Sequence, residues 1–254
     1  MPRAYRHFLP GHVWHITHRC HQREFLLRFK EDRRNWRVWL CEARRRFGLC
    51  VLDYVVTSNH VHLLVLDQGR AEVAHAMQLV AGRTAQAYND RKDRSGAFWQ
   101  DRYHATAVDT DEHLHRCLTY IDLNMVRAGV VPHPMEWETG GFREIQQPRE
   151  RYKVIDVDVL ARLCSFSHVA TFRKAHTGWI ADALAAGVGE RDERWSESVA
   201  VGRRAFVEDL RRTLRVRTPG RTIHGDGESW CIREPEDGYV TSAMGAKNGS
   251  DLER

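Results

Sequence analysis

The chain has 254 residues, a length that allows one large domain or a domain of about 150 residues with a smaller one. Of these residues 42% are hydrophobic and 29% are charged, and this apolar fraction excludes a wholly disordered chain. Lys and Arg number 39 against 34 Asp and Glu, and the resulting net charge of +5 is mildly basic and shared by many ordinary proteins. The sequence contains no apolar run of the roughly 18–20 residues that span a bilayer, and its N-terminus lacks the apolar core of a signal peptide.

The positive charge is unevenly distributed along the chain. Residues 1–46 carry +8, residues 47–147 carry −4 and residues 148–254 carry +1. Because Lys and Arg neutralise phosphates, the first fifth of the chain is the part expected to bind DNA, although arginines on a helix can also form a solvated face. The six cysteines form no CxxC pair, which argues against a disulfide framework and a structural zinc site.

The periodicity of the first half predicts the element order β-α-β-β-α-β-α. The expected elements are strand 12–20, helix 30–47, strands 49–56 and 60–67 joined as a hairpin, helix 71–89, a short strand that ends at 108, and a helix over 109–129. This order is the split β-α-β, ferredoxin-like arrangement with one added helix. Asp109 and Glu112 have the spacing of a capping box at the start of that last helix.

The second half predicts helices only. The stretch 146–151 is expected to be a linker, followed by helices over 157–164, 168–186 and 193–216, and the composition from 218 onward indicates loose structure or disorder. The expected fold class is therefore α+β, with a catalytic domain over 1–147, a small all-α accessory region over 148–217 and a flexible tail over 218–254.

His60 and His62 flank Val61 at the start of a predicted strand, directly after a tight turn. Residues i and i+2 of a strand point to the same face, so both imidazoles can bind one divalent metal while Val61 faces the core. Among 15 histidines such a pair can also arise by coincidence. Imidazole alone does not select the metal.

Tyr120 and Asn124 are four residues apart in the last predicted helix and therefore lie on one face, beside its apolar stripe. A tyrosine at the edge of a core is usually a packing residue, whereas Asn is a poor helix former that needs a polar partner. Two histidines and an amide oxygen can bind Mg²⁺ or Mn²⁺, which polarises a phosphodiester, and Tyr120 can then attack phosphorus. Arg116 and Arg127 lie on the same flank, where they can hold neighbouring phosphates.

Four stretches resemble one known family in order and spacing: PGHVWHITHRCHQREFLL, YVVTSNHVHLLV, FWQDRYHATAV and YIDLNMVRAG. The family is the single-tyrosine HUH transposases with an IS200-like domain, especially the REP-associated tyrosine transposases, and the resemblance covers roughly residues 1–145. It implies His60, His62 and Asn124 as metal ligands and Tyr120 as the nucleophile that cleaves single-stranded DNA and keeps the 5′ phosphate. The commonest form of the last motif has Pro after Asn, where this chain has Met125, so the local geometry is expected to differ.

The resemblance also implies recognition of a DNA hairpin. The arginines expected to contact DNA are Arg19, Arg23, Arg33, Arg37, Arg44, Arg116 and Arg127. Phe8, Trp14 and His15 are expected to stack or pack near bases. The stretch Trp195–Arg217 resembles a helical segment appended to some family members, and its arginines (Arg203, Arg204, Arg211, Arg212, Arg215 and Arg217) either contact DNA or belong to a bundle that aids dimerisation or substrate choice.

The leading hypothesis is a cytoplasmic, nucleoid-associated DNA transposase that cleaves and rejoins hairpin-bearing single strands through a phosphotyrosine, as a monomer or a homodimer. One alternative is a non-catalytic, domesticated hairpin-binding regulator, for which His60, His62, Tyr120 and Asn124 would not all be needed. Another is a metal-dependent phosphohydrolase that uses the histidine pair and no tyrosine.

Overall fold

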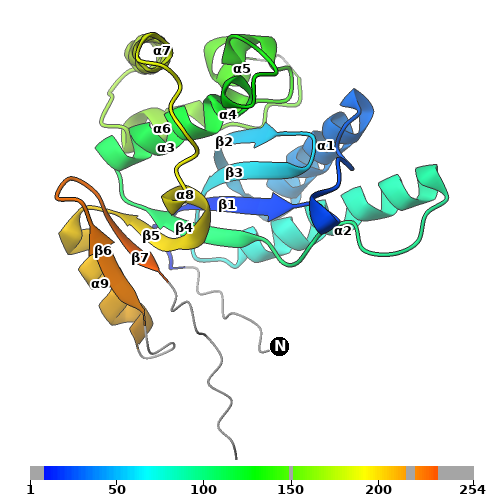
Figure 1. The fold of residues 1–254 in the computed structure, drawn as a ribbon, viewed down its shortest axis with the longest axis horizontal. Coiled ribbons are helices and arrows are strands. Elements are labelled where there is room, and N and C mark those ends of the chain that lie inside the picture. The colour runs from blue at the N-terminus through cyan, green and yellow to red at the C-terminus, as the bar shows by residue number, and fades with distance from the viewer. Residues whose placement is uncertain (1–8, 149–150, 216–220, 234–254) are drawn as a thin grey trace, which may run out of the picture.

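A computed structural model describes residues 9–148, 151–215 and 221–233, and it confirms the α+β class (Figure 1). Seven strands form one sheet in the order β2-β3-β1-β4-β5-β7-β6. The strands are β1 (Val13–Arg19), β2 (Cys50–Val56), β3 (His60–Leu66), β4 (His104–Val108), β5 (Ser198–Gly202), β6 (Thr222–Gly225) and β7 (Trp230–Arg233). The helices are α1 (Lys30–Phe47), α2 (Glu72–Lys92), α3 (Glu112–Asp122), α4 (Asn124–Arg127), α5 (Gly141–Gln146), α6 (Val157–Leu163), α7 (Val169–Ala185), α8 (Arg194–Glu197) and α9 (Arg204–Arg215), with short 3₁₀ turns η1 (His21–Arg23) and η2 (Pro134–Glu136).

The strands β1 to β4 form the predicted split β-α-β unit. β3 lies between β1 and β2 and is antiparallel to both, and β4 pairs with the other edge of β1. The hairpin β2–β3 turns at residues 57–59, as expected from the polar turn in the sequence. The predicted strands and the helices α1 and α2 agree with the structure to within a few residues.

The alternation of side chains assigns a different layer of helices to each face of the sheet. His62 pairs with Thr17, so its side chain lies on the face that also carries His15. Tyr120 of α3 approaches His62 on this face, with ring centroids 5.7 Å apart. Tyr54 pairs with Leu63 and so belongs to the opposite face, where its ring lies 6.2 Å from Trp36 of α1. The helix α1 and its arginines therefore cover the face away from Tyr120.

The predicted helix over 109–129 is not continuous and does not begin with the expected capping box. It starts at Glu112, and the carboxylate of Asp109 instead accepts hydrogen bonds from the guanidinium of Arg203, 2.7 Å from Nε. The helix then breaks at Leu123, whose ψ of 2° separates α3 from α4. The chain makes this break without the proline that is usual in the resembled family, and Asn124 becomes the first residue of α4.

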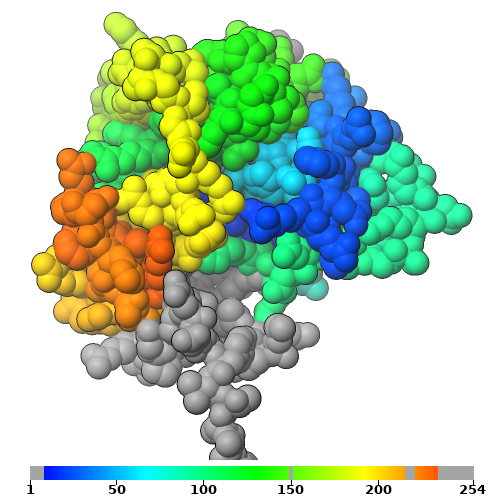
Figure 2. All heavy atoms as spheres, in the orientation of Figure 1, coloured from blue at the N-terminus to red at the C-terminus, as the bar shows by residue number. Residues whose placement is uncertain are grey.

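The expectation of an all-α C-terminal region is wrong. The predicted helix over 193–216 is three elements, α8, β5 and α9, and β5 joins the main sheet beside β4 in parallel. The residues of β5 are buried along their whole length, so the strand reads as a short apolar run, which periodicity cannot distinguish from a helix segment. In the space-filling view the yellow segment after α7 runs down the visible surface, beside the green helical layer, to the orange C-terminal elements (Figure 2).

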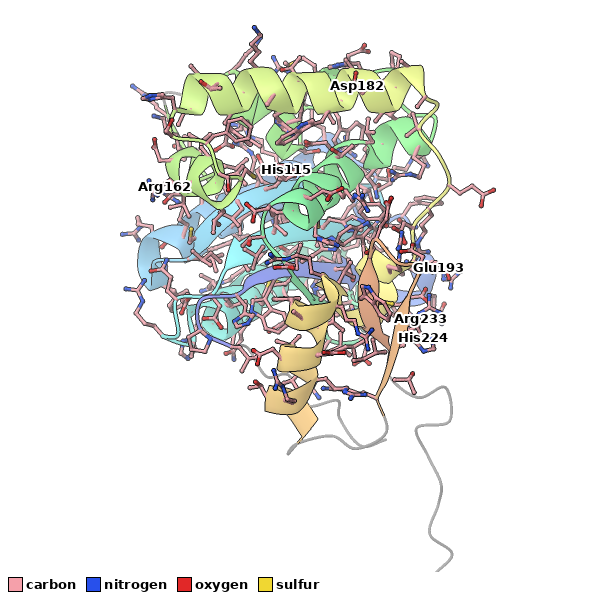
Figure 3. All side chains as sticks on the ribbon, turned by 90° about the vertical axis from the view of Figure 1, so that its left-hand side faces the viewer. His115, Arg162, Asp182, Glu193, His224 and Arg233 are labelled. Atoms are coloured by element: carbon pink, nitrogen blue, oxygen red, sulfur yellow. The ribbon has the colours of Figure 1, made fainter. Side chains whose placement is uncertain are left out.

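The expected loose tail contains ordered structure over 221–233. β6 and β7 form an antiparallel hairpin, and β7 also pairs with β5. Figure 3 shows this hairpin, labelled at His224 and Arg233, beside α9 and on the opposite side of the molecule from α7. The rest of the expected tail, residues 218–220 and 234–254, lies outside the described residues, as do positions 149 and 150 of the expected linker. The proposed division into three domains stays a prediction.

Gly202 tests whether β5 is integral to the fold. A Cβ atom at this position would lie 2.5 Å from Cβ of Asp109 and 2.6 Å from Cδ1 of Phe206. We expect Gly202→Ala to lower the free energy of unfolding by about 1–3 kcal/mol, as overpacking of a well-packed site does. Urea unfolding measures this change. The control is Gly178→Ala in α7, where a Cβ would meet nothing within 4 Å and a gain of about 0.5–1 kcal/mol is expected. Equal stability of both variants would contradict the integral role of β5.

Candidate active site

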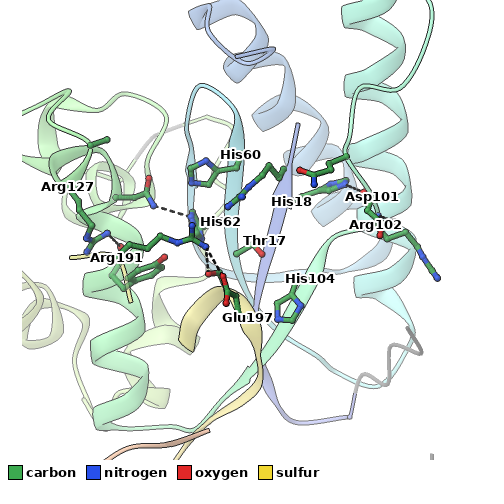
Figure 4. A pocket seen from close by; sticks show the side chains of 16 residues that line it. Thr17, His18, His60, His62, Asp101, Arg102, His104, Arg127, Arg191 and Glu197 are labelled. Carbon is green, nitrogen blue, oxygen red and sulfur yellow. Dashed lines mark hydrogen bonds and ion pairs between the residues drawn. The ribbon is translucent and has the colours of Figure 1, made fainter. Parts of the chain in front are cut away.

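The four predicted site residues His60, His62, Tyr120 and Asn124 lie in one cavity of about 440 Å³ at the edge of the sheet (Figure 4). They come from β3, α3 and α4. The other residues that line the cavity come from β1, from the loop before β4 and the first residue of β4, from the end of α4, and from the segment 191–197: Thr17, His18, Arg19, Gln100, Asp101, Arg102, His104, Arg127, Ala128, Arg191, Ser196 and Glu197.

A chain of buried hydrogen bonds holds His62. His15 on β1 is fully buried, and its Nδ1 lies 2.8 Å from the carbonyl oxygen of Trp195. Its Nε2 lies 2.9 Å from Nδ1 of His62, and Nε2 of His62 lies 3.1 Å from the amide nitrogen of Asn124. This chain of hydrogen bonds therefore runs from α8 through β1 and β3 to α4.

The carbonyl end of this chain determines the tautomer of each ring. A carbonyl oxygen only accepts hydrogen bonds, so His15 must donate from Nδ1. Burial lowers the pKa of His15 to about 3, so the ring is neutral and its Nε2 accepts. His62 then donates from Nδ1 and keeps a lone pair on Nε2. Burial, followed by the nearby His60 and His15, lowers the pKa of His62 well below its usual value. The lone pair of His62 thus faces Asn124.

His60 is oriented by the turn that precedes it. Its Nδ1 lies 2.7 Å from Oδ1 of Asn59 and 3.0 Å from the hydroxyl of Thr57. Donation from Nδ1 to these oxygens leaves Nε2 of His60 with its lone pair. Burial, together with Arg19 and Arg191, lowers the pKa of His60 to about 4, so this ring is neutral as well. The rings of His60 and His62 lie edge to face with centroids 4.9 Å apart.

These two imidazoles and the amide of Asn124 are donors that suit a divalent metal ion. Within the described residues, no group of three His, Cys, Asp or Glu side chains could hold a metal ion. A set of three metal ligands at this position therefore needs Asn124. Its amide oxygen would bind the ion once the amide group is rotated by half a turn. Imidazole nitrogen with amide oxygen fits an ion that accepts both kinds of ligand, such as Mn²⁺, better than one that strongly prefers oxygen, such as Mg²⁺.

Tyr120 is surrounded by cations. The guanidinium of Arg127 lies over its ring, 4.8 Å from the centroid, and donates to the carbonyl oxygen of Tyr120 at 3.4 Å. Burial raises the pKa of the Tyr120 hydroxyl, and the charges of Arg191 and Arg127, together with a hydrogen bond from Arg191, oppose this rise. Arginines at a phenol favour the ionised form, which is the form that attacks.

The structure brings only some of the predicted DNA-binding arginines to this site. Arg19 and Arg127 line the cavity, and the carbonyl of Arg23 accepts a bond of 3.1 Å from Asn59, next to His60. Arg116 instead pairs with Glu112 and Glu228.

The three predicted arginines of α1 lie on the other face of the sheet. Arg33 is bonded to the carbonyl of Leu27 and stacks on Trp137, with 4.6 Å to the ring centroid. Arg37 and Arg44 are half-buried along the same helix. A contact of these side chains with DNA would occur away from Tyr120.

The sequence analysis missed the roles of His15 and Arg191. His15 was expected near bases together with Trp14, but both side chains are buried, and Phe8 lies outside the described residues. The positions of His15 and His62 on adjacent strands of a predicted sheet were a usable signal for the His15 contact. No pattern marked Arg191, which lies in a loop of the region expected to be helical.

Comparisons with known proteins show that the chain is similar to transposases. Residues 10–124 match the family described as "Transposase IS200 like". This segment is similar to that family, and it contains all four predicted site residues and seven of the strands and helices around them: β1, α1, β2, β3, α2, β4 and α3. The resemblance inferred from the sequence is thereby confirmed. A comparison with curated protein sequences gave no match.

Two solved structures are similar to this chain. One is the REP-associated tyrosine transposase bound to a REP hairpin, with 20% identity, a TM-score of 0.50, and coverage of 61% of this chain and 94% of that one. It shows that the fold is shared. The other, described as a transposase from Deinococcus radiodurans, has 16% identity and a TM-score of 0.34, and it covers 51% of this chain and 96% of that one. This TM-score is too low to support an inference about the fold or function of this chain. No helix in the described parts of the chain has the length and apolar character needed to cross a membrane.

The neutral state of His15 predicts acid sensitivity. Its pKa is about 3 in the fold, against an ordinary value of 6.5, so below pH 6.5 the unfolded chain binds a proton that the folded chain does not. The free energy of unfolding therefore falls as the pH drops, by about 1.4 kcal/mol per pH unit for each such histidine. Urea unfolding in EDTA at pH 6.5, 5.5 and 4.5 measures the slope. His15→Gln should reduce the slope of the unfolding free energy against pH by the contribution of one histidine. An unchanged slope would mean that His15 is charged in the fold.

Proposed function

We propose that this protein is a metal-dependent transposase that cleaves and rejoins hairpin-bearing single-stranded DNA through a phosphotyrosine at Tyr120. The observation that carries this proposal is the convergence of Tyr120, His60, His62 and Asn124 in one cavity, with both imidazoles neutral. A protein that only binds hairpins has no need of this arrangement. A phosphohydrolase that uses the histidine pair has no need of a tyrosine surrounded by arginines.

His60, His62 and Asn124 would hold Mg²⁺ or Mn²⁺. Such an ion polarises the scissile phosphodiester and stabilises charge on its oxygens. The protein prepares the site by keeping both rings neutral, each with Nδ1 donating inside the protein and Nε2 open. His15 serves as the acceptor that maintains this state of His62.

Tyr120 would act as the nucleophile. Its phenolic oxygen forms a bond to phosphorus as the proton leaves to water, and the bond from phosphorus to the 3′ oxygen breaks. The departing 3′ oxygen takes up a proton and becomes a hydroxyl, and the 5′ phosphate stays on Tyr120. Attack by another 3′ hydroxyl reverses the step and rejoins DNA, which releases the tyrosine.

The substrate class follows from the charge of the cavity and from the shared fold. Arg19, Arg102 and Arg127 line the cavity and suit phosphates on either side of the cleavage point. The similar structure holds a REP hairpin, and we propose a hairpin foot as the substrate here as well. A DNA substrate of this kind supports the proposal that the protein acts at the nucleoid in the cytoplasm.

The decisive experiment is a search for a covalent adduct. The protein is incubated with Mn²⁺ and a labelled pool of hairpin oligonucleotides with randomised single-stranded flanks, and SDS-resistant adducts are counted. We expect an adduct with the wild type and none with Tyr120→Phe, because the attacking oxygen is absent. Hairpin binding without any adduct would leave the non-catalytic regulator as the function, and cleavage that survives Tyr120→Phe would indicate a hydrolase.

His62→Ala separates metal chemistry from folding. The variant should lose adduct formation by at least about 100-fold while hairpin affinity largely persists, because the ring contacts the metal rather than the bulk of the DNA. Gel shift and adduct assays on the same preparation measure both quantities. Equal loss of the two would mean that His62 serves the fold.

His15→Leu tests the buried hydrogen-bond chain. Loss of the acceptor leaves the Nδ1–H of His62 buried and unpaired, so the Mn²⁺ concentration for half-maximal adduct formation should rise by about 10–100-fold, as for other partners of metal-bound histidines. His15→Gln, whose amide oxygen can accept the same proton, should recover part of the affinity. Titration calorimetry with Mn²⁺ gives a second readout, and an unchanged metal affinity in both variants would contradict the role of His15.

A further inference from the structure

Arg191 reaches the candidate active site from outside the matched family segment. It lies in the loop between α7 and α8, 67 residues beyond the end of the match at residue 124. Its guanidinium nevertheless lines the same cavity as His62, Tyr120 and Asn124, and Figure 4 shows it between the α3–α4 side and the short helix α8.

Arg191 has a loosely bound carboxylate partner within the protein. Its Nη2 donates to the hydroxyl of Ser196 at 2.8 Å and lies 3.6 Å from the nearest carboxylate oxygen of Glu197, a loose ion pair with both side chains about half exposed. Glu197 also faces Arg19. An arginine can bind a carboxylate or phosphate with two parallel hydrogen bonds, and Glu197 does not use this capacity.

The cavity carries more positive charge than its own acids neutralise. Four arginines line it (Arg19, Arg102, Arg127 and Arg191) against two carboxylates (Asp101 and Glu197). The Nε of Arg127 is buried and has no hydrogen-bond partner among the described residues. Cations crowded around a buried tyrosine with unused donors form a site for an anion.

We propose that Arg191 binds the scissile phosphate and stabilises the charge that develops on it as Tyr120 attacks. The residue lines the same cavity as the attacking group, and its charge opposes the rise that burial causes in the pKa of the Tyr120 hydroxyl. In the free protein the guanidinium is held by Ser196 and Glu197, and a phosphodiester with two non-bridging oxygens offers it a stronger, two-bond partner. This inference rests on the proposed function, and it makes the region after residue 124 a direct contributor to catalysis.

The test compares Arg191→Gln and Arg191→Lys with the wild type in single-turnover adduct formation at saturating DNA. We expect Arg191→Gln to slow the reaction about 100-fold, as removal of one preorganised donor does, with hairpin affinity within about threefold of the wild type. Arg191→Lys keeps the charge but not the two-bond geometry, so its rate should fall between the two.

Arg162→Gln is the matched control, because Arg162, labelled in Figure 3, is an exposed arginine on α6 and does not line the cavity. It should react at the wild-type rate. A wild-type rate for Arg191→Gln would overturn the inference. Loss of rate in parallel with hairpin affinity would also overturn it, because Arg191 would then act in general DNA binding.

A second measurement distinguishes failure of this inference from failure of the proposed function. If the wild type forms no adduct, the phosphotyrosine mechanism is wrong, but Arg191 can still be tested as a phosphate ligand. Fluorescence anisotropy with a labelled, randomised 12-nucleotide single strand is measured on Tyr120→Phe with and without Arg191→Gln, in EDTA. This strand has no hairpin, so hairpin contacts cannot mask the loss of one phosphate contact. A loss of affinity of threefold or more for this strand on removal of Arg191 supports phosphate binding, and equal affinities contradict it.

Discussion

The hydrogen-bond chain from the Trp195 carbonyl through His15 to His62 is the interaction on which the candidate site depends. A carbonyl accepts only, so it sets the tautomer of His15, which in turn sets that of His62 and leaves the lone pair of His62 toward Asn124. Each link comes from a different part of the fold. The register of β1 on β3 brings the two rings together, and the docking of α8 and β5 supplies the carbonyl. The chemistry of one imidazole thus requires two elements, β1 and α8, whose bonded residues are 180 positions apart in sequence.

The second constraint is the break between α3 and α4. With regular helical geometry Tyr120 and Asn124 would stack one above the other, whereas the turn at Leu123 makes Asn124 the first residue of a new helix. Arg127 stabilises this arrangement, because it donates to the carbonyl of Tyr120 and covers its ring. The resembled family usually has proline at the position of Met125, so here tertiary contacts, rather than a proline, produce the break.

The sequence was informative where one face of an element is buried and the other is not. The alternation in β3 and the helical period of α1 follow from such burial, and they predicted both the split β-α-β unit and the shared position of His60 and His62. β5 is buried along its whole length, which removes the alternation, and its five residues are too few to outweigh the helical pattern on both sides. Arg191 could not be found, because a loop residue reaches its site only through the packing of α7 and α8.

The charge distribution illustrates the same limit. The excess of +8 over residues 1–46 suggested a DNA-binding face beside the catalytic one, but α1 carries much of it and covers the opposite face of the sheet from Tyr120. The cations of the cavity come from β1, from the loop before β4, from α4 and from the loop before α8. Charge that is contiguous in sequence was therefore dispersed by the fold, and charge scattered along the chain was gathered at the tyrosine. Coulomb energy depends on distance in space, so only the second group can act on a phosphate at the reacting centre.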